Sequence, residues 1–137
     1  MIGVVIVTHG QLAAELLNAA ETIVGDLPQF AAVSIGWHED VQDARGDIAA
    51  AIERVQNGSG VLVLTDMFGG TPSNLGMTFL ERDKVEVITG VNLPMLIKLA
   101  GLKEPPSLLE VARDMREHGR SAIWVASDLL RGEKTPA

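Results

Sequence analysis

Short apolar segments alternate with longer amphipathic segments along the chain, and this alternation limits the fold more than any other feature. Strands that are apolar on both sides need helices on both faces of their sheet. The pattern therefore predicts a doubly wound α/β fold with a mostly parallel sheet and helices on both faces. The expected strands are residues 2–8, 30–35, 60–65, 84–89 and 121–126.

Helices are expected where apolar residues recur every three or four positions. Leu12, Leu16 and Ile23 follow this spacing in the first helix, which Gly25 ends. The other helices are expected from 41 to about 57, at about 72–80, in a short segment that ends before 101, and at 107–119. Residues 1–137 are expected to form one domain, with a frayed tail at 127–137.

Composition excludes several classes of protein. The net charge of −7 argues against nucleic-acid binding, which depends on Lys and Arg. The absence of cysteine excludes disulfides and thiolate sites, and the three scattered histidines lack the spacing of metal ligands, so neither a metal nor a cofactor is expected. No basic residue precedes the N-terminal apolar run and no run is long enough to span a bilayer. We therefore expect a cytoplasmic protein without membrane insertion.

The third expected strand leads directly into a loop that carries an acidic residue and a glycine pair. Asp66 follows the strand, and Gly69 and Gly70 let the backbone approach a ligand closely. Thr71 is a favourable helix N-cap, and Pro72 suits the first helical position. Because the unpaired N–H groups at a helix start attract anions, this loop predicts an anion site.

The predicted topology brings a histidine to the same place. His9 ends the first strand, and right-handed crossovers on opposite sides make the first and third strands neighbours, about 4.8 Å apart. His9 and Asp66 would then flank the point where the strand order reverses, which is where such folds bind ligands.

This pair of residues fits nucleophilic chemistry at a histidine. If Asp66 accepts the N–H of one ring nitrogen of His9, the other nitrogen keeps its lone pair and can attack. The donors at Gly70 and Thr71 suit the oxygens of a phosphoryl group, whose transfer depends mainly on positioning and charge stabilisation. No Lys or Arg cluster accompanies the loop to hold a nucleoside triphosphate, so a protein is expected to donate the phosphoryl group.

Residues beside the pair have two interpretations each. Met67 and Phe68 would form an apolar ring for a protein partner if exposed, and belong to the core otherwise. Ser73 is expected on the surface of the first helical turn, at the rim of the site, in preference to the alternative role of a nucleophile. Asn92 and Pro94 fit either a contact at the rim of the site or a simple helix start.

Three motifs resemble the mannose-family IIA component of the bacterial phosphotransferase system. They are Val-Thr-His-Gly at 7–10, Asp-Met-Phe-Gly-Gly-Thr-Pro-Ser-Asn at 66–74 and Gly-Val-Asn-Leu-Pro-Met-Leu at 90–96. The resemblance implies that His9 takes a phosphoryl group from the phosphocarrier protein HPr, on the nitrogen distal to Asp66, and passes it to a histidine of a IIB partner. It also implies a homodimer in which residues 121–126 pair antiparallel with the partner's sheet.

The chain departs from the family pattern in two respects. Transporters of the family often have Trp-Gly-Gly-Ser where this chain has Phe68 to Thr71, and the hydroxyl is retained. The sequence ends at Ala137 without a IIB region, so we expect a stand-alone member that serves a regulatory phosphorelay.

Other functions remain open on the residues alone. Asp66 could itself accept the phosphoryl group in a receiver-like switch, although no acidic pair follows the first strand to hold Mg²⁺. A hydrolase using Ser73 or Thr71 lacks a nucleophile-elbow motif. A nucleotide-binding module lacks both common glycine-rich motifs.

Overall fold

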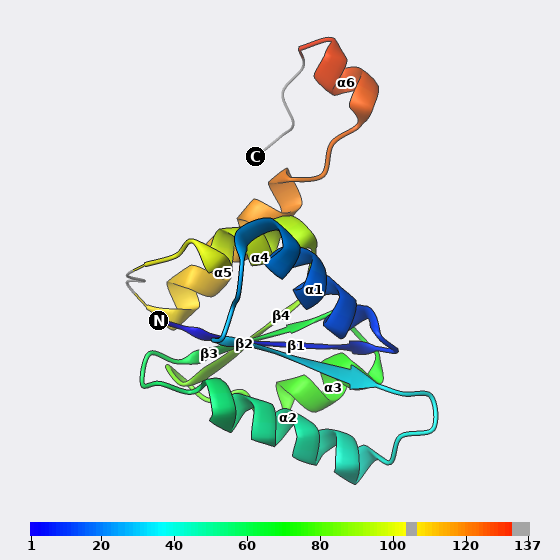
Figure 1. Cartoon of the computed structure of the whole chain (residues 1–137), viewed down its shortest axis with the longest axis vertical. Helices are drawn as coiled ribbons and strands as arrows, with labels where there is room; N and C mark the ends of the chain where they lie inside the picture. The colour runs from blue at the N-terminus through cyan, green and yellow to red at the C-terminus, as the bar shows by residue number, and fades with distance from the viewer. Residues whose placement is uncertain (104–106, 133–137) are drawn as a thin grey trace.

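Four parallel strands form one sheet in the order β2-β1-β3-β4 in the computed structural model (Figure 1). The structure describes residues 1–103 and 107–132. The predicted α/β fold with a parallel sheet is confirmed. The strands are β1 (Gly3–His9), β2 (Phe30–Ile35), β3 (Val61–Thr65) and β4 (Val85–Thr89).

Helices cover both faces of this sheet, as Figure 1 shows. On one face lie α1 (Leu12–Val24), α4 (Leu93–Ala100) and α5 (Leu108–Ser121). On the other lie α2 (Val41–Val55) and α3 (Thr71–Met77). The short helix α6 (Ala126–Leu130) stands away from the sheet and its covering helices.

Alternate residues of the strands supply two separate hydrophobic cores. In β1, Val4 and Ile6 belong to the core under α1, α4 and α5, whereas Val5 and Val7 belong to the core under α2 and α3. Because successive side chains of a strand point to opposite faces, a strand covered on both sides must be apolar throughout. This explains why the strand segments are continuous apolar runs.

The crossovers place β1 between β2 and β3. Helix α1 carries the chain from β1 to β2 on one face, and α2 returns it to β3 on the other. Residue Val7 pairs with Thr65, so the carboxyl ends of β1 and β3 lie side by side. The predicted neighbourhood of the first and third strands is therefore confirmed.

The C-terminal part of the chain differs from the expectation. No strand is present at 121–126 in the described chain, because α5 continues to Ser121 and residues 122–125 connect it to α6. A strand needs a neighbour to satisfy its backbone groups, and among the residues that the structure describes no strand lies beside this segment. Of the tail expected to fray from residue 127, residues 127–130 belong to α6 and residues 133–137 lie outside the described residues, so the fraying stays a prediction.

Candidate active site

His9 and Asp66 meet at the carboxyl ends of β1 and β3. The Nδ1 atom of His9 lies 2.7 Å from Oδ2 of Asp66, and the backbone N–H of His9 donates to the same oxygen at 2.9 Å. The His9 side chain is 52% exposed and that of Asp66 only 14%. The imidazole is therefore accessible to a partner, while the carboxylate beneath it is not.

The charge on Asp66 determines which ring nitrogen is free. Partial burial raises the pKa of Asp66, but hydrogen bonds from the His9 backbone, the His9 ring and the Met67 N–H outweigh burial and hold this pKa below its ordinary value. An ionised carboxylate can only accept, so Nδ1 of His9 must donate. In the neutral imidazole, Nε2 then carries the lone pair.

The glycine pair passes directly against the imidazole. A Cβ atom built on Gly70 would lie 2.6 Å from Cε1 and 3.0 Å from Nε2 of His9, so no side chain fits there while the ring keeps its place. Gly69 has a φ of 95°, in the region that favours glycine. Both glycines are therefore required by the backbone path beside Nε2.

The start of α3 differs from the prediction by one residue. Gly70, and not Thr71, is the N-cap, and Thr71 is the first helical residue, exposed to solvent. No side chain caps this helix, but the Oγ of Ser73, in the first turn, accepts the Gly69 N–H at 2.9 Å and donates to the Gly70 carbonyl at 3.1 Å. Ser73 is fully buried, so its expected position at the rim of the site was wrong.

The remaining predicted rim residues separate into two groups. Met67 and Phe68 are 58% and 71% exposed, which excludes their alternative role in the core. Asn92 instead starts α4, because its Oδ1 accepts the Met95 N–H at 3.1 Å and its Nδ2 donates to the Gly119 carbonyl at 3.0 Å. Pro94 follows it in the first turn of α4 and is partly exposed.

Sequence reasoning missed two hydroxyls that shape the site. One is Ser73 in its buried position. The other is Thr8, which is fully buried and accepts the Ala13 N–H at 2.6 Å. This hydrogen bond ties the start of α1, at Leu12, to the residue before His9. A Thr placed a few residues before a helix is a signal of this role, because short hydroxyl side chains favour helix starts.

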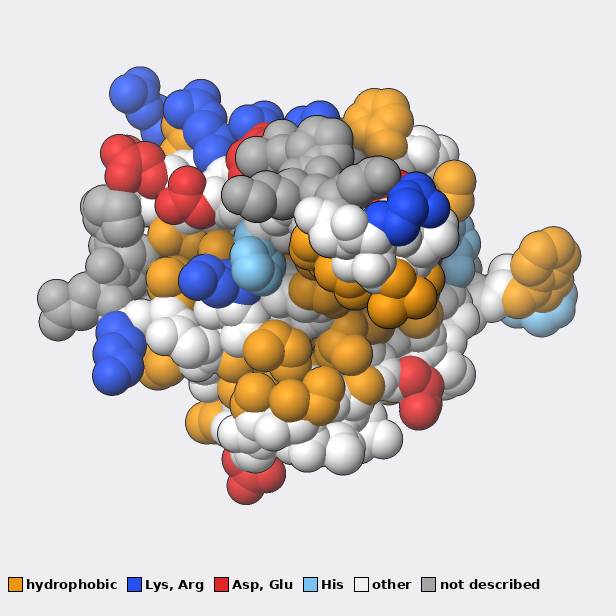
Figure 2. Space-filling view, turned by 90° about the horizontal axis from the view of Figure 1, so that it is seen from above, with side chains coloured by type: hydrophobic (Ala, Val, Ile, Leu, Met, Phe, Trp, Pro, Cys, Tyr) orange, Lys and Arg blue, Asp and Glu red, His pale blue; other side chains and the backbone are white. Residues whose placement is uncertain are grey.

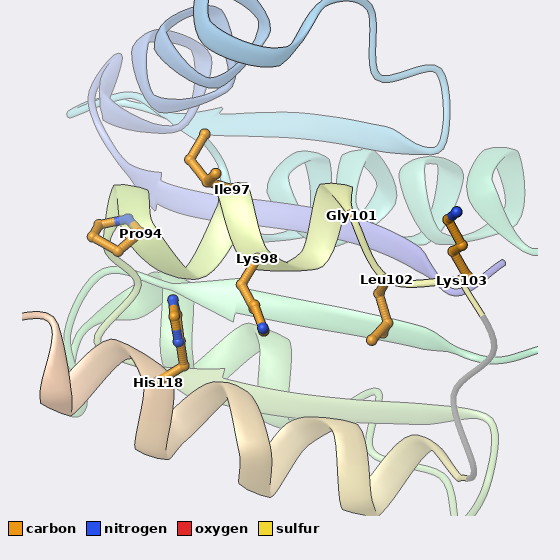
Figure 3. Close-up of a pocket in the computed structure, with 7 residues that line it drawn as sticks. All are labelled: Pro94, Ile97, Lys98, Gly101, Leu102, Lys103 and His118. Carbon is orange, nitrogen blue, oxygen red and sulfur yellow. The ribbon is translucent and has the colours of Figure 1, made fainter.

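A separate cavity of about 650 Å³ lies between α4 and α5 (Figure 3). It is lined by Pro94, Ile97 and Lys98 of α4 and by His118 of α5, whose ring points toward α4. Neither His9 nor Asp66 contributes to it. Within residues 1–103 and 107–132, no group of three or more His, Asp or Glu side chains is placed to hold a metal ion.

The fold and the site together define a class: a doubly wound α/β domain with an accessible histidine, oriented by a carboxylate, at the reversal of the strand order. The chain matches the family model described as "PTS system fructose IIA component" over residues 3–115. It therefore belongs to this family of IIA components, which act as phosphotransferases in the sugar phosphotransferase system. No helix in the described ranges has the length and apolar character needed to cross a membrane.

Individual relatives agree with this membership. The chain is 29% identical to the fructose-specific EIIA component of Bacillus subtilis (strain 168), over 98% of this chain and 93% of the relative. It is 32% identical to the mannose-specific EIIAB component of Escherichia coli (strain K12), over 89% of this chain but only 38% of that longer protein. Among solved structures, the mannose/sorbose-specific IIA subunit from Enterococcus faecalis matches with a TM-score of 0.80 and 30% identity, covering 90% of this chain and 93% of that one.

Proposed function

We propose that this protein is a histidine phosphocarrier that accepts a phosphoryl group on Nε2 of His9 from phospho-HPr. It passes the group to a histidine of a IIB partner or uses it as a regulatory signal in the cytoplasm. The observation that carries the proposal is the contact of 2.7 Å between Nδ1 of His9 and Oδ2 of Asp66. This contact leaves Nε2 as the nucleophile on a half-exposed ring.

The transfer step needs little from the protein beyond position and charge. The lone pair of Nε2 forms a bond to phosphorus while the bond from phosphorus to the donor's histidine nitrogen breaks, and that nitrogen keeps the electron pair. Nε2 carries no proton at the start, so none has to leave. The positive charge that develops on the imidazole is stabilised by the Asp66 carboxylate beside Nδ1.

The loop beside Nε2 supplies donors for the phosphoryl oxygens. Within the described chain, the backbone N–H groups of Gly70 and Thr71 have no acceptor, as is usual at a helix start. We assign these groups, the Thr71 hydroxyl and Gly69, whose φ of 95° lets the backbone turn toward the site, to phosphate binding. The exposed Met67 and Phe68 beside them suit the docking of a protein donor.

The same geometry disfavours phosphorylation of Asp66. Its Oδ2 accepts from the His9 backbone and faces Nδ1, and its Oδ1 accepts from the Met67 N–H at 2.8 Å. A carboxylate that attacks phosphorus must give up such bonds, whereas Nε2 need not. Ser73 is fully buried, which likewise argues against a serine hydrolase.

We also propose a homodimer in which residues 121–126 of one copy pair with β4 of the other. Strand β4 ends the sheet and, within the described chain, has a strand neighbour on one side only. Ile123, Trp124 and Val125 are exposed, and Figure 2, which views the molecule from the α6 side, shows hydrophobic side chains gathered on this face. Unpaired strand edges and exposed apolar residues favour association.

Intact-mass analysis of a phosphorylation reaction tests the phosphocarrier role. The full chain, incubated with phosphoenolpyruvate, enzyme I and HPr, should gain one phosphoryl group that is lost in acid. His9→Ala should gain none, whereas the matched controls His38→Ala and His118→Ala should be phosphorylated like the wild type. An acid-stable, hydroxylamine-sensitive product that persists in His9→Ala would instead identify Asp66 as the acceptor.

A further inference from the structure

We propose that Ser73 is a positioning residue for the reaction at His9, because its buried hydroxyl holds the glycine loop against the imidazole. This inference rests on the proposed phosphocarrier function. It assigns to Ser73 a role inside the site, in place of a contact with a partner.

The hydroxyl ties two consecutive residues of the loop. The Ser73 Oγ accepts a hydrogen bond from the Gly69 N–H at 2.9 Å and donates one to the Gly70 carbonyl at 3.1 Å. That carbonyl also accepts the Asn74 N–H at 2.9 Å, the first hydrogen bond of α3. Ser73 therefore fixes the orientation of the Gly69–Gly70 segment from within the helix.

Apart from the hydrogen bonds at the Met67 N–H and the Gly70 carbonyl, little else holds the loop. Met67 and Phe68 are exposed, and the two glycines have no side chains that could pack. Gly69 has a φ of 95°, a conformation that residues with a side chain rarely adopt. The loop therefore depends on the hydrogen bonds of the Ser73 hydroxyl, and not on side-chain packing, to keep one conformation.

This loop in turn limits where the imidazole can lie. The space for a Cβ on Gly70 is occupied by Cε1 and Nε2 of His9, so the ring and the Gly70 backbone are in close contact. Asp66 holds the ring at the other ring nitrogen, Nδ1. The Gly70 backbone is therefore the surface that determines the position of the reacting nitrogen and of the amide groups beside it.

Only a group that donates and accepts at one atom can make both of these bonds. A serine hydroxyl does so, whereas alanine at this position would leave the Gly69 N–H without this acceptor and the Gly70 carbonyl with only the Asn74 N–H. A loop free to move by about 1 Å can slow a reaction on the order of 100-fold. The effect is expected on the rate of transfer and not on the affinity for the donor.

Single-turnover transfer from phospho-HPr to Ser73→Ala tests the proposal. We expect the maximal rate to fall about 10- to 100-fold, with little change in the HPr concentration that gives half of it. The control is Thr78→Ala, which removes another hydroxyl of the same region, one that donates to the Leu75 carbonyl at 2.6 Å. This control should transfer at the wild-type rate.

Two further measurements keep the result clear. Nitrogen-15 NMR of His9 should show a changed Nε2 environment in Ser73→Ala but not in Thr78→Ala, and exchange of the Gly69 amide should be faster in Ser73→Ala alone. If Ser73→Ala does not fold, Ser73→Cys takes its place, because its thiol is a weak donor and acceptor of similar shape. Its maximal rate should lie below that of the wild type, but by less than the fall expected for Ser73→Ala.

Unchanged maximal rates and His9 signals in the folded variant would overturn the positioning role. So would a loss confined to HPr affinity, which would return Ser73 to the partner surface. A wild-type protein that takes no phosphoryl group on His9 would reject the proposed function itself, while the NMR comparison would still decide whether Ser73 orders the loop.

Discussion

Asp66 shows how one side chain can combine structural and chemical roles. Its two oxygens face three donors, namely the His9 backbone, the His9 ring and the Met67 backbone. Every one of these bonds requires an acceptor, which a carboxylate provides at both oxygens. The contacts that orient the nucleophile are thus also contacts that join the ends of β1 and β3.

Asp66→Asn should destabilise the protein by about 1–3 kcal/mol at neutral pH, because either orientation of the amide places an NH₂ group against a backbone N–H. Denaturant unfolding of both proteins measures this difference. Asp47→Asn, at an exposed position of α2, is the control and should change stability little.

The pH dependence of that difference has a defined sign. The folded pKa of Asp66 is lowered, so the stability that the ionised carboxylate contributes is complete above its ordinary pKa. It is lost as the pH falls through the folded value. The gap between wild type and Asp66→Asn should therefore shrink as the pH falls through the folded pKa of Asp66; a gap that keeps its full size in strong acid would contradict the assigned charge state.

At the scale of elements, the position of the site depends on how closely α2 approaches the sheet. A Cβ built on Gly3 would lie 2.5 Å from the Val55 carbonyl oxygen and 2.7 Å from its Cγ2. The first residue of β1 must therefore lack a side chain for α2 to end where it does. This contact helps to place β3, which follows α2 and carries Asp66.

Gly3→Ala should destabilise the protein by about 1–3 kcal/mol, because a backbone atom has to move to admit the methyl group. Gly46→Ala is the matched control: Gly46 lies inside α2 and a Cβ there meets nothing within 4 Å. It should stabilise the protein by about 0.5–1 kcal/mol. A Gly3→Ala protein that is as stable as the wild type in thermal unfolding would contradict the steric role assigned to Gly3.

At the scale of the whole molecule, apolar side chains of the C-terminal segment stay exposed in the part of the chain that the structure describes. Ile123, Val125 and Leu130 are exposed, and α6 stands away from the sheet. Beside β4, a groove of about 310 Å³ is lined by Ile88, Thr89 and residues of α5. Pairing of residues 121–126 with β4 of a second copy would cover the groove and the exposed apolar side chains of that segment.

Light scattering after size exclusion should therefore give the mass of a dimer for the wild type. Val125→Pro should shift it toward monomer, because proline has no N–H for strand pairing, while the φ of −90° at Val125 tolerates proline in the single chain. Ser127→Pro, in the first turn of α6 and outside the expected strand, should remain dimeric. A monomeric wild type would remove the basis for the exchanged strand.

The sequence alone determined most of the fold and the central pair of the site. Continuous apolar strands, helical spacing and right-handed crossovers predict that β1 and β3 are neighbours, and His9 and Asp66 at their ends then have to meet. These features depend on the period of the sequence and on chain chirality, both of which are local properties.

Only the tertiary structure decided the details that depend on distances between elements. Ser73 looked like a surface residue because its neighbours in sequence suit a helix start, yet packing of α3 against the sheet buried it and directed its hydroxyl to the glycine loop. Residues 121–126 have the apolar character of a strand, but a strand forms only where another edge is available. Burial and pairing are properties of the whole arrangement, so no local pattern can specify them.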